Sequence, residues 1–352
     1  MTRIPVRASR PYEVLIAPGL LERTGELLRP LTGAEKVALV CGDRVYPLYA
    51  ARVVSALERA GFCVSVKLIP HGEENKTLAV YGEILDFMCQ NELGREDLVI
   101  ALGGGVTGDL AGFAAATYQR GCGFVQIPTT LLAAVDASVG GKCAVDLPGG
   151  KNQAGCFYQP LAVLCDTESF STLPPEELRC GLAEVVKYGV LFDRALFDSL
   201  RAGDILPRAE ELVASCVEHK RRIVERDETE RGERQLLNLG HSFGHAVERC
   251  SGYSLPHGEA VSIGLAMIAR AAAKRGLCSG ESAREIVTLL HALSLPTESP
   301  FSAAALFEAL RHDKKRAGET LTLVVPREIG RCELMNVPFE ESGDWLRDGG
   351  AT

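Results

Sequence analysis

Features that mark several other classes of protein are missing from this 352-residue sequence. It has no run of basic residues, and its net charge of -8 is the reverse of a nucleic-acid-binding footprint. It has no uninterrupted apolar span long enough to cross a bilayer, and its first residues lack the apolar core of a signal peptide. We therefore expect a cytoplasmic protein that binds neither nucleic acid nor membrane.

Cysteine is plentiful, but the CxxC pair is absent. The twelve cysteines are scattered, mostly among apolar neighbours, so we predict buried thiols rather than disulfides. The length of the chain is enough for two domains.

The first half of the chain alternates short apolar runs with helical patterns. Strands are predicted at 37–41, 61–69 and 98–102, and helices at 49–59, 77–91 and 109–118. This alternation predicts an α/β domain with a parallel sheet and helices on both faces. The second half reads as helical, at 178–190, at 216–226 and after residue 257, with a short strand at 321–326.

Glycine is concentrated where the third strand ends, in Gly103 to Asp109, which satisfies GxGxxG between a strand and a helix. Such glycines let a pyrophosphate approach the N-terminus of the helix. The acid expected about twenty residues later is missing, so this is not the ordinary Rossmann fingerprint. Asp43 and Glu73 are acids that could hold ribose hydroxyls instead. The alternative is a tight turn that packs a helix on the sheet.

Two lysines stand in glycine-rich segments that we predict to be turns. Lys142 and Lys151 suggest an anion site for phosphate or carboxylate, although a solvated surface lysine is the alternative for each. The nearby Thr129 and Thr130 can hydrogen-bond either a cofactor or the backbone.

Histidine is scarce, yet three of the seven residues lie between positions 241 and 257. His241 and His245 are four apart, so they share a helix face. His257 follows Pro256 at a predicted helix start, where the dipole and free amides oppose protonation. A neutral imidazole is the form that a divalent metal needs.

The glycines at 240, 244 and 258 are predicted to leave room beside these imidazoles for a ligand. The alternative is that the histidines are ordinary helix-face residues with local hydrogen bonds. Glu184 also has two interpretations. It lies three residues before Lys187 on a predicted helix, which suits an intrahelical ion pair, and it could equally be the oxygen ligand of a catalytic metal.

Six segments carry a family resemblance. They are GGGVTGD (103–109), IPTTLLAAVDASVGGK (127–142), GKNQAGCFYQP (150–160), LPPEELRCGLAEVVKYG (173–189), LNLGHSFGHAVE (237–248) and LPHGEAV (255–261). With DKK at 313–315, they cover nearly the whole chain, which thereby resembles 3-dehydroquinate synthase.

The resemblance implies a cytoplasmic, homodimeric lyase of the shikimate pathway that depends on NAD and zinc. The reaction converts 3-deoxy-D-arabino-heptulosonate 7-phosphate, a phosphorylated sugar acid, into 3-dehydroquinate and phosphate. The implied reaction proceeds in four steps, which are transient oxidation by NAD, phosphate elimination, reduction and an aldol closure. The implied domains are a Rossmann-like NAD-binding domain (1–168) and a mainly helical metal- and substrate-binding domain (169–352), with the active site in the cleft between them.

The resemblance also assigns roles to residues. Glu184, His241 and His257 are the implied ligands of one divalent metal, zinc or cobalt. Implied NAD contacts are Asp43, His71, Gly72, Glu73, Glu74, Asn75, Lys76, Gly105, Val106, Thr107, Gly108, Asp109, Thr129, Thr130, Lys142, Lys151, Ser169, Phe170, Ser171 and Thr172. Implied catalytic and substrate contacts are Asp136, Lys142, Asn152, Lys187, Lys220, Arg234, Asn238, His245 and either Lys314 or Lys315. Arg120 matches an arginine that reaches the phosphate site of the neighbouring subunit.

Three alternatives stay open. The chain departs from the family pattern at His71, Ala134, Cys143 and Asp146, and a different sugar phosphate cyclase is the nearest competitor. An iron-type polyol dehydrogenase would accumulate NADH, and the number of lysines argues against it. A non-enzymatic NAD sensor would not need Glu184 together with two histidines.

Overall fold

The computed structural model describes residues 1–311, 316–317 and 319–352. They form two compact units, Met1–Leu173 with Ala209–Thr229, and Pro174–Arg208 with Glu230–Thr352. The sequence predicts a single boundary, between residues 168 and 169, which assigns residues 209–229 to the second domain. In the structure these residues belong to the first unit, because their helix packs against its strands.

The first unit is built on a seven-stranded sheet in the order β1-β2-β9-β6-β5-β3-β4. Its strands are β1 (Thr2–Val6), β2 (Tyr12–Ala17), β3 (Lys36–Gly42), β4 (Cys63–Ile69), β5 (Leu98–Gly103), β6 (Gly123–Pro128) and β9 (Ala162–Asp166). β1 runs antiparallel to β2 at one edge, and the other neighbouring strands pair in parallel. The predicted parallel α/β sheet is confirmed.

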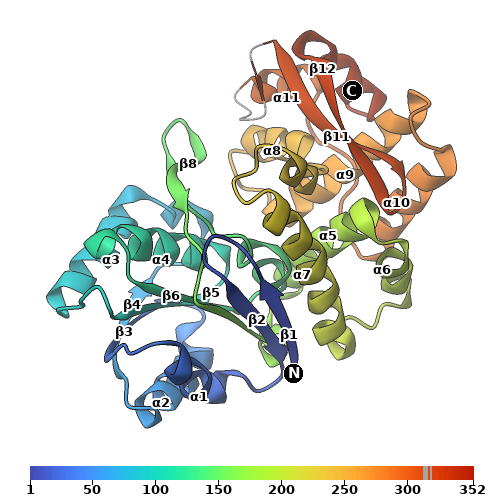
Figure 1. Cartoon of the computed structure of the whole chain (residues 1–352). Coiled ribbons are helices and arrows are strands. Elements are labelled where there is room, and N and C mark those ends of the chain that lie inside the picture. Colours follow the sequence, from blue (N-terminus) through green and yellow to red (C-terminus); the bar gives the residue numbers. More distant parts are fainter. Residues whose placement is uncertain (312–315, 318) are drawn as a thin grey trace. The chain divides into compact units, whose positions relative to one another are not determined.

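Helices cover both faces of this sheet, as predicted. The helices of this unit are α1 (Thr24–Leu28), α2 (Ala51–Arg59), α3 (Leu78–Gln90), α4 (Gly105–Thr117) and α7 (Ala209–Arg226). α1 and α2 lie on one face, with α3 and α4 on the other (Figure 1). β5 is buried along its whole length, because strands covered on both faces are apolar throughout.

The second unit is mainly helical and carries a small antiparallel sheet. Its helices are α5 (Pro175–Phe192), α6 (Arg194–Ser199), α8 (His241–Cys250), α9 (His257–Lys274), α10 (Gly280–Ala292), α11 (Ala303–Leu310) and α12 (Ser342–Asp348). Its sheet has the order β10 (Arg316–Ala317), β11 (Thr320–Glu328), β12 (Arg331–Pro338). Among the described residues, every helix is too short or too weakly apolar to cross a lipid bilayer.

Several predicted element boundaries are wrong. α4 begins at Gly105, four residues before the predicted start, so the glycine run joins the end of β5 directly to the first residue of the helix, with Gly104 as N-cap. α7 begins at Ala209 instead of residue 216. Lys142 and Lys151 lie in strands, not turns, on the hairpin formed by β7 (Lys142–Leu147) and β8 (Gly150–Phe157).

The prediction of buried thiols is partly confirmed. Six cysteines are buried, whereas Cys63 and Cys89 are exposed on the surface. Cys63 opens β4, which lies at the edge of the sheet, so its side chain has fewer neighbours than its apolar sequence context suggests.

Glycines bring three helices of the second unit into close contact. A Cβ at Gly258 would lie 2.3 Å from Cys180 Cα, where α9 crosses α5. A Cβ at Gly244 would lie 2.9 Å from the carbonyl oxygen of Ala260, where α8 crosses α9. Gly240 precedes α8 with φ +77° and abuts the backbone nitrogen of Leu265. The prediction that these glycines leave room for a ligand is wrong, because neighbouring backbone fills that room.

We expect Gly258→Ala to destabilise the second unit, because backbone cannot move aside as a flexible side chain can. Overpacking of this kind costs about 1–3 kcal/mol, which urea unfolding would measure. Gly82→Ala in α3 is the matched control. No atom lies within 4 Å of a Cβ there, so alanine should be neutral or stabilise by up to about 1 kcal/mol. Equal stability of the two variants would contradict the packing role of Gly258.

Candidate active site

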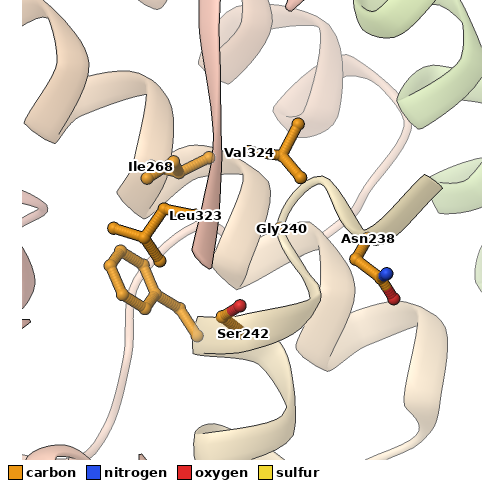
Figure 2. Close-up of a pocket in the computed structure, with 7 residues that line it drawn as sticks. Asn238, Gly240, Ser242, Ile268, Leu323 and Val324 are labelled. Atoms are coloured by element: carbon orange, nitrogen blue, oxygen red, sulfur yellow. The ribbon is translucent and has the colours of Figure 1, made fainter. Parts of the chain in front are cut away.

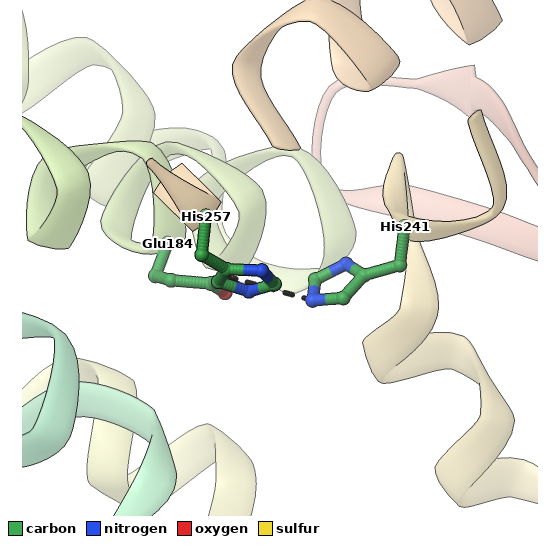
Figure 3. Close-up of side chains that lie close together, drawn as sticks. All are labelled: Glu184, His241 and His257. Atoms are coloured by element: carbon green, nitrogen blue, oxygen red, sulfur yellow. Dashed lines mark ion pairs between the residues drawn. The ribbon is translucent and has the colours of Figure 1, made fainter. Parts of the chain in front are cut away.

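Glu184, His241 and His257 converge on one point in the second unit. They come from α5, α8 and α9, and their side chains point toward one another (Figure 3). Both imidazole Nε2 atoms lie 3.5 Å from Glu184 Oε1, and the two ring centroids are 5.3 Å apart. One ligand atom from each residue lies within 4.8 Å of the others, so the three could hold one metal ion.

The donor set fits a divalent metal such as zinc. One carboxylate oxygen and two imidazole nitrogens are a common catalytic zinc set that leaves a fourth position open. Tetrahedral bonds of about 2.1 Å place donors about 3.4 Å apart, close to the spacing of Glu184 Oε1 from each Nε2 atom. Glu184 is 1% exposed, and Oε1 has no hydrogen-bond donor in suitable geometry among the described residues.

The other oxygen of Glu184 faces Lys187. Lys187 Nζ lies 2.5 Å from Glu184 Oε2, and both side chains are 1% exposed. The two interpretations of Glu184 are therefore compatible, because Oε2 takes part in the intrahelical ion pair while Oε1 faces the histidines. A metal at this point would be bound through Oε1 alone.

The expectation that His257 resists protonation is wrong for the metal-free protein. Burial does lower the pKa of His257, but the carboxylates of Glu248 and Glu184 outweigh it and raise that pKa to about 10. Glu248 Oε1 lies 3.4 Å from Nδ1 and Glu184 Oε1 lies 3.5 Å from Nε2. The two buried carboxylates thus raise the pKa of His257 by more than the helix dipole lowers it.

The predicted NAD residues gather at one edge of the sheet in the first unit. Apart from Lys142 and Lys151 on the β7–β8 hairpin, each predicted segment follows the carboxyl end of a strand: Asp43 after β3, 71–76 after β4, 105–109 after β5, Thr129 and Thr130 after β6, and 169–172 after β9. β3 continues to β4 on one side and lies beside β5 on the other, so the order reverses there. Open α/β sheets bind ligands at such a switch point.

The start of α4 supplies backbone amides for an anion. The N–H of Gly108 donates to the carbonyl of Gly104, so the amides of Gly105, Val106 and Thr107 precede the first intrahelical hydrogen bond. Free amides and the helix dipole together favour a phosphate group. Nearby, the buried hydroxyl of Thr129 has no hydrogen-bond partner among the described residues. Both features fit a dinucleotide.

The ammonium group of Lys76 contacts several of the predicted residues. Its Nζ atom lies 2.5 Å from Asp109 Oδ2 and 2.5 Å from Asn152 Oδ1. Burial opposes its charge, but the carboxylates of Asp109 and Glu73 outweigh burial and raise its pKa. Glu73 also pairs with Lys151 at 3.6 Å. Lys76 therefore stays charged and links α4 to the β7–β8 hairpin.

Asp43 and His71 lie together on the surface. Asp43 Oδ1 accepts a hydrogen bond from the backbone N–H of His71 at 3.1 Å, and His71 Nδ1 is also 3.1 Å away. Slight burial opposes it, but the hydrogen bonds from His71 and Arg44 lower the pKa of Asp43. Asp43 remains a carboxylate that could accept from a ribose hydroxyl.

The predicted substrate residues divide between the two units. In the first, Lys220 pairs with the Asp136 carboxylate and donates to its backbone carbonyl at 2.6 Å. In the second, Arg234 is buried and Asn238 Nδ2 donates to Glu230 Oε1 at 2.9 Å. His245 is half-buried, and its ring lies edge-on to His241.

A cavity of about 10 Å³ borders the loop before α8. Ile268 and Leu323 lie together on one side of the loop at Gly240, and Asn238 lies on the other (Figure 2). This volume holds about one water molecule, so the cavity is not a substrate site.

Among the predicted site residues that the structure describes, Arg120 stands apart from the rest. Arg120 lies between α4 and the amino end of β6, so it is at the opposite edge of the sheet from the NAD residues of its own chain. Lys314 and Lys315 lie outside the described residues.

Two acids beside the site were not predicted. Glu248 contacts His257, and Glu230 accepts from Asn238. Glu248 follows His241 by seven residues and His245 by three, and this helical spacing was a usable signal. Glu230 carried none, because it lies in a loop far from any periodic pattern.

Comparison with known proteins decides the family. Sequence models of the 3-dehydroquinate synthase N-terminal and C-terminal domains match residues 66–180 and 181–316. The 3-dehydroquinate synthase of Desulforamulus reducens is 45% identical over 335 residues, which are 93% of each chain. The chain belongs to the 3-dehydroquinate synthase family. Its predicted family and fold class are confirmed.

Solved structures of two related cyclases share the fold. A 2-deoxy-scyllo-inosose synthase complexed with carbaglucose-6-phosphate, NAD⁺ and Co²⁺ is 25% identical, with a TM-score of 0.89 over 99% of this chain and 100% of that one. The 2-epi-5-epi-valiolone synthase of Streptomyces hygroscopicus, with NAD⁺ and Zn²⁺ bound, is 28% identical, with a TM-score of 0.88 over 96% of both chains.

The raised pKa of His257 predicts that metal binding releases a proton. At pH 8 the imidazole of the metal-free protein carries a proton, which a metal must displace from Nε2. Titration calorimetry with Zn²⁺ in buffers of different ionisation enthalpy should show about one proton released per metal at pH 8. Binding without proton release would contradict the charged state of His257.

The same shift predicts how the stability of the metal-free protein depends on pH. The pKa of His257 lies above its ordinary value of 6.5, so its stabilising contribution is complete below that value and is lost as pH rises through about 10. Urea unfolding between pH 6.5 and pH 10 should show this loss. His257→Ala should remove that part of the pH dependence, and an unchanged profile in the variant would contradict the assignment.

Proposed function

We propose that this chain is a 3-dehydroquinate synthase, which converts 3-deoxy-D-arabino-heptulosonate 7-phosphate into 3-dehydroquinate and phosphate. The observation that carries the proposal is the convergence of Glu184, His241 and His257 in a chain that belongs to this family. A lyase acting on a phosphate ester also suits the lysines of the first unit. The reaction then belongs to the shikimate pathway, which leads to chorismate and the aromatic amino acids.

The proposed cofactors are one divalent metal and NAD. Glu184 Oε1, His241 Nε2 and His257 Nε2 would hold the metal, and the residues after β3, β4, β5, β6 and β9 would hold NAD. NAD⁺ with Co²⁺ or Zn²⁺ is bound in the two related cyclases, which supports the same pair here. When bound, the metal supplies a Lewis acid for a substrate hydroxyl and NAD accepts and returns a hydride.

The polar residues of the chain then bind and orient the substrate. Lys142, Asn152 and Arg234 are proposed to hold its phosphate, so that the phosphate itself can take the proton during elimination. The ion pair of Lys220 with Asp136 keeps the ammonium group in place on α7. His245 and Asn238 are proposed to bind substrate hydroxyl or carboxylate groups. That the reaction takes place in a cleft between the two domains stays a prediction.

Identity favours this substrate over those of other cyclases. The relative named 3-dehydroquinate synthase is 45% identical, against 25% and 28% for the inosose and valiolone synthases. The retained cationic residues suit a substrate that carries both a carboxylate and a phosphate.

We further propose a homodimer in the cytoplasm. Arg120 lies away from the NAD residues of its own chain, which suits an arginine that serves a second subunit. The twelve cysteines form no disulfide, which suits a reducing compartment. Burial raises the pKa of Cys41 and Cys122 to about 12, so these thiols stay protonated.

The direct test follows phosphate release and NADH absorbance together. With the heptulosonate phosphate, NAD⁺ and Zn²⁺, phosphate should form in proportion to substrate while NADH does not accumulate, and a chelator should abolish the reaction. Steady NADH production from a polyol would show a dehydrogenase instead. Release from a glucose phosphate but not from the heptulosonate would show another cyclase.

Substitution of one proposed ligand distinguishes a loss of metal binding from a loss of folding. His257→Ala should lose bound metal and at least about 100-fold in turnover, because a two-ligand site no longer fixes the metal. His291→Ala, which removes a histidine of α10 that contacts Thr297, is the matched control and should keep both. Full metal occupancy in His257→Ala would remove this residue from the ligand set.

A further inference from the structure

Glu248 is a buried carboxylate that the proposed reaction leaves without a role. It lies on α8, and its side chain is 2% exposed. Glu248 Oε1 is 3.4 Å from His257 Nδ1, and Oε2 is 4.0 Å from His245 Nε2. A buried acid needs a partner to remain in an apolar interior, and two imidazoles of the candidate site lie beside Glu248.

The placement of Glu248 decides which nitrogen of the His257 ring is available to a metal. Nδ1 faces Glu248, and Nε2 on the opposite side of the ring faces Glu184 Oε1 at 3.5 Å. His241 has the same arrangement, since its Nδ1 lies 3.1 Å from the carbonyl oxygen of Leu239 and its Nε2 faces Glu184. Each imidazole thus has an acceptor on Nδ1 and presents Nε2 to the common point.

His257 needs such a restraint more than His241 does. It is the first residue of α9, directly after Pro256, and its side chain is 34% exposed, against 11% for His241. Packing alone therefore leaves the His257 ring freer to rotate. Glu248 comes from another helix, so it fixes the ring across the α8–α9 contact.

We propose that Glu248 is a positioning residue for the metal ligand His257. It accepts a hydrogen bond from Nδ1–H, which selects the tautomer with its lone pair on Nε2 and holds the ring toward Glu184. A carboxylate in this place also makes the imidazole a stronger donor to a metal. The inference rests on the metal site of the proposed function.

A second metal is the competing explanation for the same residues. Donor atoms of His245, Glu248 and His257 also lie within 4.8 Å of one another. Such an ion would take His257 through Nδ1 and Glu248 as a direct ligand. The 4.0 Å spacing of His245 from Glu248 and the 43% exposure of His245 make this set looser than that of Glu184. The number of metal ions bound distinguishes the two.

The test measures Zn²⁺ affinity and stoichiometry in the full chain, by competition with a chromophoric chelator. Glu248→Ala should weaken binding by about 10–100-fold, the usual effect of removing an outer partner of a metal-bound histidine. Glu248→Gln keeps an acceptor oxygen but loses the charge, so it should weaken binding less, by about 3–10-fold. Glu259→Gln is the matched control. It removes one negative charge two residues after His257, where the carboxylate pairs with Arg179 at 3.7 Å, and should bind as the parent does.

The visible absorption of the Co²⁺-loaded protein is the second readout. Rotation of His257 should change the ligand-field bands in Glu248→Ala and leave them unchanged in Glu259→Gln. Parent-like affinity and bands in Glu248→Ala would overturn the inference. Two ions in the parent chain, with one lost in Glu248→Ala, would overturn it in favour of a second metal.

The design separates this inference from the proposed function. A parent chain that binds no metal would contradict the metal site itself, whatever the variants do. If Glu248→Ala fails to fold by circular dichroism, Glu248→Gln against Glu259→Gln decides. A loss of at least about threefold in the glutamine variant at residue 248 alone supports positioning, and equal affinities overturn it.

Discussion

A carboxylate oxygen buried beneath two imidazoles is the constraint around which the second unit is arranged. Glu184 Oε1 has both Nε2 atoms at 3.5 Å, in a place where an uncompensated charge would be costly. Lys187 pairs with Oε2 of the same carboxylate. On the side of Oε1, protonated His257 supplies the charge in the metal-free protein, and a divalent cation would replace that proton. Metal and proton therefore compete for the same position, which couples metal affinity to pH.

Helix packing makes this convergence achievable. The three residues are far apart in sequence, and each lies on a different helix. Gly258 lets α9 approach α5, and Gly244 lets α8 approach α9, so backbone contact rather than side-chain packing sets the helix spacing. Lys187 contacts the second carboxylate oxygen of Glu184, and Glu248 contacts Nδ1 of His257. The first unit meets a different need, since its parallel strands bring loops from distant segments to one edge of the sheet.

Much of this was predictable from the sequence, because the relevant signals are local. Apolar alternation predicts β3, β4 and β5, and the run of glycines after β5 marks a phosphate-type helix start even though the helix begins four residues early. The spacing of His241 and His245 places them on one face. The resemblance then assigns His241 and His257 to the metal and His245 to the substrate, a choice that spacing alone leaves open.

Other features depend on tertiary contacts and had no local signal. The glycines beside the histidines read as space for a ligand, and only the crossing helices show that backbone occupies that space. The helix dipole predicts a neutral His257, but the buried charge of Glu248, brought in from another helix, reverses that effect. Likewise, α7 follows helices of the second unit in sequence and yet packs on β1 and β2.

The anomalous difference map of a Zn²⁺-loaded crystal, measured at the zinc edge, tests the central claim most directly. One strong peak is expected, about 2.0–2.2 Å from Glu184 Oε1, His241 Nε2 and His257 Nε2. A peak bound by His245 and Glu248 instead, or none beside Glu184, would contradict it.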